Sequence, residues 1–246
     1  MISKFTDIHC HMLFDVDDGS YSLENSLEMA ALSVESGVSD VICTPHCIPG
    51  MFENYAGEQL NERFEQFKNA LIKEEIPLNI HLGMEVYGNE NTADDLKNHR
   101  LCTLAGSRYL LIEFNFGENP QMVNYILDDV ADLGYVPVIA HPERYDFVAR
   151  NPSLLYRWAD KGYLMQCNKD SIRGKFGKMI YRISMDMMKD RLVSFVGSDA
   201  HGALHRTPFL EYAYNMVEDN FGTDYAAEIF CANPQKIITN SVINNI

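Results

Sequence analysis

Seven short apolar runs alternate with segments of helical periodicity along this chain of 246 residues. The runs are rich in aliphatic and aromatic residues and are mostly bounded by Gly, Pro, Asp or Asn, which is typical of strands. The predicted strands span residues 2–8, 40–44, 78–86, 109–114, 136–140, 163–168 and 193–196. Strands that alternate with helices favour a parallel sheet with right-handed crossovers. The sequence therefore predicts an α/β fold whose sheet is either open or closed into a barrel.

The segments between the strands predict helices with recognisable starts. Ser22 is placed as the N-cap of one helix, and Asn119 with Pro120 forms the start of another. Residues 48–57 contain Pro, Gly, Phe and Tyr and indicate a surface loop. No linker divides the chain, and one α/β barrel commonly has this length. Residues 1–246 are therefore predicted to form a single domain.

The composition excludes several classes of protein. The formal net charge of −15 argues against nucleic acid as a partner, because most of the surface would repel a phosphate backbone. No apolar run approaches the ~20 residues that cross a bilayer, and the chain does not begin with a secretory signal pattern, so direct membrane insertion is not expected. Its six cysteines lack paired spacing, which favours reduced thiols and a cytoplasmic protein.

Side chains of metal-ligand type occur where the apolar strands stop. The carboxyl ends of parallel strands meet at one rim of an α/β fold, so these residues are predicted to lie together. In an extended strand, His9 and His11 point to the same face. Ile8 and Cys10 are expected on the opposite face. The candidate metal ligands are His9, His11, Asp18, His46, Glu85, Glu113, His141, Asp199 and His201.

The ligand types indicate which metals the rim would bind. Five histidines and four carboxylates without a thiolate suit Mn²⁺, Fe²⁺ or Zn²⁺ better than a structural zinc site. Each ion takes about three or four protein ligands, so nine candidates indicate two or three divalent ions. Glu85 is the best bridging candidate, because its strand lies near the middle of the set. Ions roughly 3.5–4 Å apart activate water and clamp the oxygens of a displacement at phosphorus.

Two arginines are placed to bind a phosphoryl group beside these ligands. Arg144 follows His141 by three residues, and Arg206 follows His201 by five. Guanidinium groups match the geometry of phosphoryl oxygens and stabilise the charge that develops on them. Arg144 and Arg206 are therefore the predicted catalytic residues. His205, just before Arg206, has no predicted role.

Eight of the nine candidate ligands, all except Glu113, and the two arginines fall in six short motifs. These are His9-Cys-His11, Asp17-Asp18-Gly19, Thr44-Pro45-His46, Gly83-Met-Glu85, His141-Pro-Glu-Arg144-Tyr145, and Ser198-Asp199-Ala-His201 with Arg206. Together they resemble the PHP (polymerase and histidinol phosphatase) superfamily. More narrowly, they look like its CpsB/CapC/YwqE branch of bacterial protein-tyrosine phosphatases. The resemblance runs in order from Asp7 to Arg206 and covers nearly the whole chain.

The resemblance implies a distorted TIM-like barrel of seven strands and a three-metal site that favours manganese. One ion would lie on His9, His11, Glu85 and Asp199, a second on Glu85, Glu113 and His141, and a third on Asp18, His46 and His201. Arg144 and Arg206 would bind phosphate. The implied substrate is a phosphotyrosine tail on a bacterial tyrosine kinase that controls capsule or exopolysaccharide synthesis. Hydrolysis would proceed by direct attack of metal-bound hydroxide, without a phosphoenzyme.

A thiol-based mechanism would be a different route to the same activity. Cys102 and Arg108 have the C-x5-R spacing of thiol-based tyrosine phosphatases. In those enzymes a helix follows the loop, and its amides lower the pKa of the thiol and bind phosphate. Here a predicted strand, 109–114, follows instead. This order places the segment on the rim opposite the candidate ligands and argues against a thiol nucleophile.

The metal ligands are compatible with more than one activity. They do not separate a protein-tyrosine phosphatase from a phosphodiesterase or from a phosphatase of small phosphomonoesters such as histidinol phosphate. The basic loop from Lys169 to Lys178 is a modest indication of an acidic, extended substrate. A structural metal site closes with about four ligands, so nine argue against a non-catalytic module. By resemblance, an amidohydrolase would have a lysine where this chain has Glu113.

Overall fold

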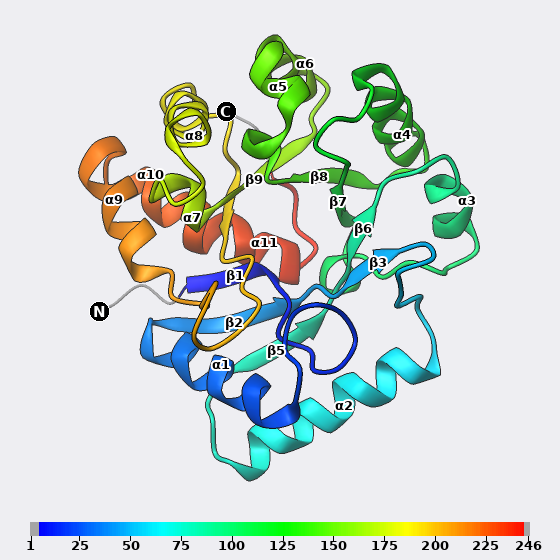
Figure 1. Cartoon of the computed structure of the whole chain (residues 1–246), viewed down its shortest axis with the longest axis vertical. Coiled ribbons are helices and arrows are strands. Elements are labelled where there is room, and N and C mark those ends of the chain that lie inside the picture. Colours follow the sequence, from blue (N-terminus) through cyan, green and yellow to red (C-terminus); the bar gives the residue numbers. More distant parts are fainter. Residues whose placement is uncertain (1–4, 244–246) are drawn as a thin grey trace.

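The computed structural model describes residues 5–243 and shows a mixed α/β fold in which helices surround mostly parallel strands (Figure 1). The strands are β1 (Phe5–Cys10), β2 (Val38–Cys43), β3 (His46–Ile48), β4 (Phe52–Glu53), β5 (Asn79–Leu82), β6 (Glu85–Tyr87), β7 (Tyr109–Glu113), β8 (Val136–Ala140), β9 (Leu164–Asn168) and β10 (Phe195–Gly197). The helices are α1 (Leu23–Glu35), α2 (Glu58–Lys73), α3 (Thr92–Lys97), α4 (Pro120–Asp132), α5 (Asp146–Arg150), α6 (Ser153–Asp160), α7 (Lys169–Ile172), α8 (Lys178–Lys189), α9 (Glu211–Phe221), α10 (Thr223–Ala227) and α11 (Asn233–Ile238). The predicted alternation is confirmed except where β2, β3 and β4, and likewise β5 and β6, follow one another without a helix. Residues 2–4 of the first predicted strand lie outside the described residues.

The strands form two hydrogen-bonded sheets, with the orders β1-β2-β5 and β10-β9-β8-β7-β6-β3-β4. Neighbours pair in parallel except in the antiparallel hairpin of β3 and β4. The chain passes from β2 into β3 and from β5 into β6, so these two paths connect the sheets. At the other edge, the amide of His11 donates to the carbonyl of Ala200 at 2.9 Å, and the amide of Asp199 donates to the carbonyl of His9 at 2.8 Å. The end of β1 is therefore bonded to the segment that follows β10.

Strands β1, β7, β8, β9 and β10 are almost entirely buried, which explains their nearly continuous apolar sequences. In β7, Leu110 and Ile112 belong to a larger apolar cluster that also contains helix side chains, whereas Tyr109 and Leu111 belong to a smaller one. The smaller cluster joins side chains of β1, β2, β7, β8, β9 and β10 to Ile237 of α11. Strand interiors and α11 thus enclose one apolar layer.

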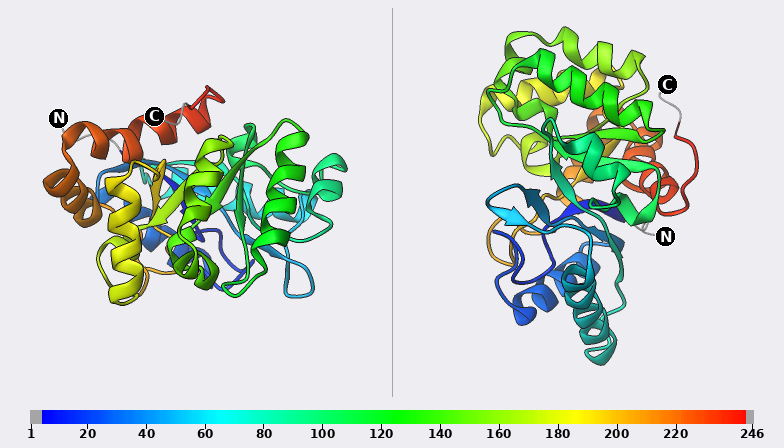
Figure 2. Two further views of the ribbon diagram at one scale, coloured as in Figure 1. Left: turned by 90° about the horizontal axis from the view of Figure 1, so that it is seen from above. Right: turned by 90° about the vertical axis from the view of Figure 1, so that its right-hand side faces the viewer.

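The two ends of the strand assembly differ. Figure 2 shows α10 and α11 on one side of the strands, and the loops after β1 and β3 on the opposite side. The apolar layer with α11 occupies the first side. The carboxyl ends of the parallel strands, which carry the candidate ligands, open toward the second.

The predicted helix starts are confirmed. The hydroxyl of Ser22 accepts a hydrogen bond from the amide of Asn25 at 3.2 Å. The side chain of Asn119 accepts one from the amide of Gln121 at 2.9 Å, and Pro120 is the first residue of α4. These side chains satisfy amides that have no partner within the helix.

Two predictions about strand continuity are wrong. The predicted loop 48–57 contains part of the β3–β4 hairpin, in which Ile48 pairs with Phe52. The predicted strand 78–86 is broken between β5 and β6 at Gly83. A Cβ atom at Gly83 would lie 2.7 Å from the side chain of Ile42, so the close approach of the main chain there requires glycine.

Two predictions about side-chain placement also need correction. Ile8 and Cys10 do not share a face: Ile8 lies in the smaller apolar cluster and Cys10 in the larger. The reason is a register shift in β1 between Asp7 and Cys10. The basic loop from Lys169 to Lys178 begins as helix α7, and Lys169 is fully buried with its ammonium group 3.4 Å from Asp170. Not all of this loop is a solvated basic surface.

Within residues 5–243, none of the helices combines the length and the apolar character that crossing a membrane requires.

The buried layer inside the strands should dominate the stability of the fold. Replacing Leu111 by Ala removes a fully buried side chain, and we expect the free energy of unfolding to fall by about 2–5 kcal/mol. Ile72 is 70% exposed on α2, so Ile72→Ala should change that free energy by no more than about 0.5 kcal/mol. Urea denaturation of both variants in the presence of EDTA measures the difference. Equal effects of the two substitutions would show that the inner layer is not tightly packed.

Candidate metal centre

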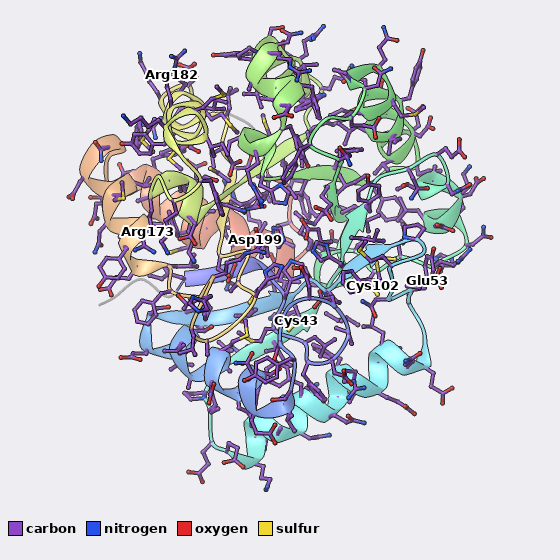
Figure 3. All side chains as sticks on the ribbon, in the orientation of Figure 1. Cys43, Glu53, Cys102, Arg173, Arg182 and Asp199 are labelled. Carbon is purple, nitrogen blue, oxygen red and sulfur yellow. The ribbon has the colours of Figure 1, made fainter. Side chains whose placement is uncertain are left out.

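The structure brings all nine predicted ligands together. Seven lie at or after the carboxyl ends of strands, whereas His46 and Glu85 are the first residues of β3 and β6, in the segments that follow β2 and β5. They come from the end of β1 and the loop after it, the starts of β3 and β6, the end of β7, and the segments after β8 and β10. Figure 3 labels Asp199 near the centre of the strands. The residues assembled there are His9, His11, Asp18, His46, Glu85, Glu113, His141, Asp199 and His201.

Glu85 lies at the centre of this cluster. Its Oε2 atom is 3.0 Å from Nε2 of His9, 3.1 Å from Nε2 of His11 and 3.2 Å from Nδ1 of His46. Its Oε1 atom is 3.0 Å from Nε2 of His141. Glu85 is fully buried, and burial alone would raise the pKa of its carboxyl. The surrounding imidazoles outweigh burial and hold that pKa well below its usual range, so the carboxylate stays ionised.

The other three carboxylates extend the cluster in different directions. Asp199 places Oδ1 3.6 Å from Nε2 of both His9 and His11. Glu113 places Oε1 3.0 Å from Nδ1 of His46. Asp18 is partly exposed, and its Oδ1 lies 3.4 Å from Nε2 of His201 and 3.6 Å from Nε2 of His46. The hydrogen bond to His201 is the main cause that lowers the pKa of Asp18 to about 2.

The ligand atoms form four overlapping sets in which all atoms lie within 4.8 Å of one another. The sets are His11, Asp18, His46 and His201; His9, His11 and Asp199; His9, Glu85 and His141; and His46, Glu85 and Glu113. Each set has the residue types and spacing that a divalent ion needs. Because residues are shared between sets, the geometry fits several neighbouring ions better than one.

Two buried atoms in this cluster are placed as ligands of a cation would be. Oε2 of Glu85 and Nδ1 of His46 lie 3.2 Å apart, yet neither makes a hydrogen bond of acceptable geometry. Native proteins rarely leave buried polar atoms without such partners. Buried ligand atoms that converge without a hydrogen bond are in the arrangement that a metal ion completes, so the residues present fit divalent metals.

Two imidazoles of the metal-free cluster, those of His11 and His46, hold protons tightly. Burial opposes protonation of His11, but the Asp17 carboxylate, which also accepts a hydrogen bond from it, and the nearby Glu85 carboxylate raise its pKa to about 9. Burial likewise opposes protonation of His46, and Glu85 with Glu113 raises its pKa to about 9. A bound metal would replace these protons, since an imidazole ligand must be neutral.

Sequence reasoning missed three side chains that orient the ligands. Asp17 receives the Nδ1 proton of His11 at 2.8 Å and also accepts from the amide of His46. Gln166 accepts from Nδ1 of His9 at 2.9 Å. Asn168 donates to Oδ2 of Asp199 at 2.6 Å. Such contacts fix the ring and carboxylate orientations at metal sites. Asp17 stands next to Asp18 in the sequence, which was the one available signal.

Both predicted arginines reach the same ligand. Nη2 of Arg206 is 2.6 Å from Oδ1 of Asp199, and Nη1 of Arg144 is 3.3 Å from Oδ2. The Arg144 guanidinium also lies over the rings of Phe116 and Phe176, at 4.8 and 4.7 Å from their centroids. The two cations therefore border the ligand cluster, where an anion bound at the metals would meet them.

The main chain is strained at three positions in this region. His141, Asp199 and Arg206 have φ values of 35°, 49° and 48°, in the left-handed region that residues other than glycine seldom adopt. Strained conformations of this kind persist where the surroundings enforce them, and they occur often at functional sites. The side chains concerned are two candidate ligands and one of the two arginines.

The structure gives no support to a thiol nucleophile at Cys102. Only a three-residue 3₁₀ turn, Leu104–Gly106, lies between Cys102 and Arg108, and strand β7 begins at Tyr109, so no α-helix follows the thiol. Burial raises the pKa of the Cys102 thiol to about 11, which keeps it protonated and unreactive at neutral pH.

Known proteins of similar sequence carry related names. Tyrosine-protein phosphatase YwqE of Bacillus subtilis is 37% identical over 218 residues, which cover 89% of this chain and 85% of that protein. Tyrosine-protein phosphatase CpsB of Streptococcus pneumoniae is 34% identical, and the match covers 96% of this chain and 99% of that protein. Putative tyrosine-protein phosphatase CapC of Staphylococcus aureus is 32% identical, and the match covers 97% of this chain and 92% of that protein.

Solved structures agree with these matches. A chain from the crystal structures of YwqE and S. pneumoniae CpsB, described as metal-dependent tyrosine phosphatases, superposes with a TM-score of 0.91 at 35% identity and covers 97% of this chain and 96% of its own. A histidinol phosphate phosphatase of Lactococcus lactis shares the fold, with a TM-score of 0.55 at 15% identity. The match covers 91% of this chain and 94% of that chain. Residues 5–239 match the family described as capsular polysaccharide synthesis, CpsB/CapC. The resemblance inferred from the motifs is thereby confirmed, and the chain belongs to the CpsB/CapC family.

Proposed function

We propose that this protein is a metal-dependent protein-tyrosine phosphatase. Its substrate is a phosphotyrosine tail on a bacterial tyrosine kinase that controls capsule or exopolysaccharide synthesis. The observation that carries the proposal is the buried carboxylate of Glu85 within 3.2 Å of four imidazoles, beside two arginines. The names of relatives at 32–37% identity over most of their length support the substrate class.

The cofactors in this proposal are two or three divalent ions, with manganese preferred over iron or zinc. The proposed ligands are His9, His11, Glu85 and Asp199 for one ion, Glu85, Glu113 and His141 for a second, and Asp18, His46 and His201 for a third. When bound, such ions lower the pKa of coordinated water and stabilise negative charge on phosphoryl oxygens. Glu85 has the central position that a shared ligand requires.

The remaining steps belong to the protein's own side chains. Arg144 and Arg206 bind the phosphoryl oxygens, exchanging part of their contact with Asp199 for the substrate. Asp17 and Gln166 keep two histidine rings oriented. Water attacks phosphorus in line with the leaving phenol, whose pKa of about 10 makes it a tolerable leaving group. No phosphoenzyme forms.

We also propose that the strands close into one distorted, TIM-like barrel and that residues 1–246 form a single domain. The chain runs from β2 into β3 and from β5 into β6, and these two paths connect the sheets side by side, β2 with β5 and β3 with β6. The main-chain bonds of His11 and Asp199 link β1 to the segment after β10, at the point where a seven-strand ring would close.

The proposed location is the cytoplasm, and nucleic acid is not a proposed partner. All six cysteines are free, and four of them are buried, as in proteins of reducing compartments. A net charge of −15 repels polyanions over most of the surface, so binding of phosphate is confined to the site.

Neutralising Glu85 should remove metal and activity together. Glu85→Gln keeps the shape but loses the charge that four imidazoles surround, and we expect kcat/KM on a phosphotyrosine peptide to fall by about 10²-fold or more. Bound manganese, measured by mass spectrometry, should fall in parallel. Glu65→Gln on the exposed face of α2 is the matched control. Full activity in Glu85→Gln would contradict the proposal.

Metal removal and thiol alkylation should have opposite outcomes. EDTA should abolish turnover, and added manganese should restore it, because the ligand cluster contains no thiolate. Iodoacetamide should leave turnover of the native protein unchanged, since burial raises the pKa of Cys102. Iodoacetamide inactivation together with resistance to EDTA would replace the metal mechanism with a thiol mechanism.

Removing a phosphate-binding arginine should weaken catalysis without emptying the site. For Arg206→Ala we expect kcat/KM on a phosphotyrosine peptide to fall about 10²-fold while manganese content is retained. Arg182→Ala is the matched control, because that side chain is 85% exposed and points outward at the edge of the molecule (Figure 3). Measuring kcat/KM for the same peptide and for histidinol phosphate also separates the proposed activity from a small-molecule phosphatase. A preference for histidinol phosphate in the native protein would argue for the latter.

A further inference from the structure

Two phenylalanine rings flank Arg144 at the border of the ligand cluster. Phe116 lies in the segment after β7, and Phe176 lies between α7 and α8. Their ring centroids are 4.8 and 4.7 Å from the guanidinium carbon. Contacts of this length are cation–π interactions, which stabilise a fixed orientation of the guanidinium. Arg144 is thus held by Asp199 from the metal side and by two aromatic rings.

Phe116 packs against two neighbouring rings and still keeps much of its surface exposed. It is 41% exposed, although its ring meets the ring of His141 edge-on at 6.3 Å and that of Tyr145 at 6.0 Å. Its main chain is fixed, because its carbonyl accepts from the amide of Asp146 at 2.9 Å. A rigidly placed ring therefore keeps part of its apolar surface open beside a candidate metal ligand. Exposed aromatic surface in such a position marks a contact for a ligand.

We infer that Phe116, with Phe176, seats the phenyl ring of the substrate and makes the site selective for aryl over alkyl phosphate esters. This inference rests on the proposed function. A phenyl ring is joined to phosphorus through a single oxygen, so a phosphoryl group bound by Arg144 brings that ring next to the guanidinium. Both phenylalanine rings lie at that distance. Aromatic pairs in offset or edge-to-face contact gain stability beyond the area that they bury.

The same contacts could serve only to position Arg144. In that case, loss of Phe116 would disturb the guanidinium and weaken every phosphate or phosphonate ligand to the same degree. A ring that contacts the substrate acts on aryl ligands alone. The two roles are therefore distinguished by comparing an aryl with an alkyl ligand that bind the same metal and arginine groups but do not react.

The experiment measures competitive inhibition of the manganese-loaded full chain by phenylphosphonate and methylphosphonate. For the native protein we expect phenylphosphonate to bind about tenfold more tightly. Phe116→Leu should remove most of this preference by weakening phenylphosphonate, with little change for methylphosphonate. The KM for a phosphotyrosine peptide should rise by a similar factor, while kcat changes less.

Two variants control the measurement. Phe116→Tyr keeps the ring and should keep the preference. Tyr125→Leu removes an aromatic side chain that is 68% exposed on α4, outside the ligand cluster, and should change neither inhibitor. Equal weakening of both phosphonates in Phe116→Leu, or no aryl preference in the native protein, would overturn the inference.

Failure of the proposed function would look different. If the native protein hydrolyses no phosphotyrosine with any divalent metal, the phosphatase proposal is wrong. Phosphonate binding, followed by calorimetry in place of inhibition, would still decide whether Phe116 selects aryl ligands.

Discussion

A buried carboxylate surrounded by imidazoles is the interaction on which this structure depends. Glu85 is fully buried, and isolating such a charge from water costs several kcal/mol unless partners compensate it. Its partners are histidines from the ends or beginnings of three other strand segments, β1, β3 and β8. Because those residues are far apart in the sequence, the charge is compensated only when the strands are correctly paired. The site and the sheet order therefore stabilise one another.

Asp199 connects the metal ligands to the arginines. One of its oxygens lies near His9 and contacts Arg206, while the other accepts from Asn168 and contacts Arg144. A carboxylate that faces both a cation site and two guanidinium groups couples metal occupancy to the position of those groups. The left-handed main chain at Asp199 aims its side chain into this position, and the bond from its amide to β1 holds it there. The strained main chain at Asp199 therefore positions the carboxylate of that residue.

The strand ends and the ligands on them were predictable, because apolar runs and acidic or imidazole side chains are distinctive in sequence. The amides of Gln166 and Asn168 were not, since at the end of β9 they look like ordinary polar residues until their partners are known. The break at Gly83 was hidden because apolar alternation continues across it, and only contact with the neighbouring strand reveals it. Burial of Lys169 was likewise hidden, because charge in a basic segment indicates exposure.

An acidic protein that binds a phosphate ester must reverse its charge locally. At the site, four carboxylates and two guanidinium groups leave a net negative charge when the imidazoles are neutral, as ligands must be. The metal-free cluster would therefore repel phosphate, or would have to keep protons on its histidines to reduce that repulsion. Two divalent ions, as proposed above, would make the same cluster positive, with the arginines already in place beside it. Metal binding is thus a condition for holding the substrate as well as for activating water.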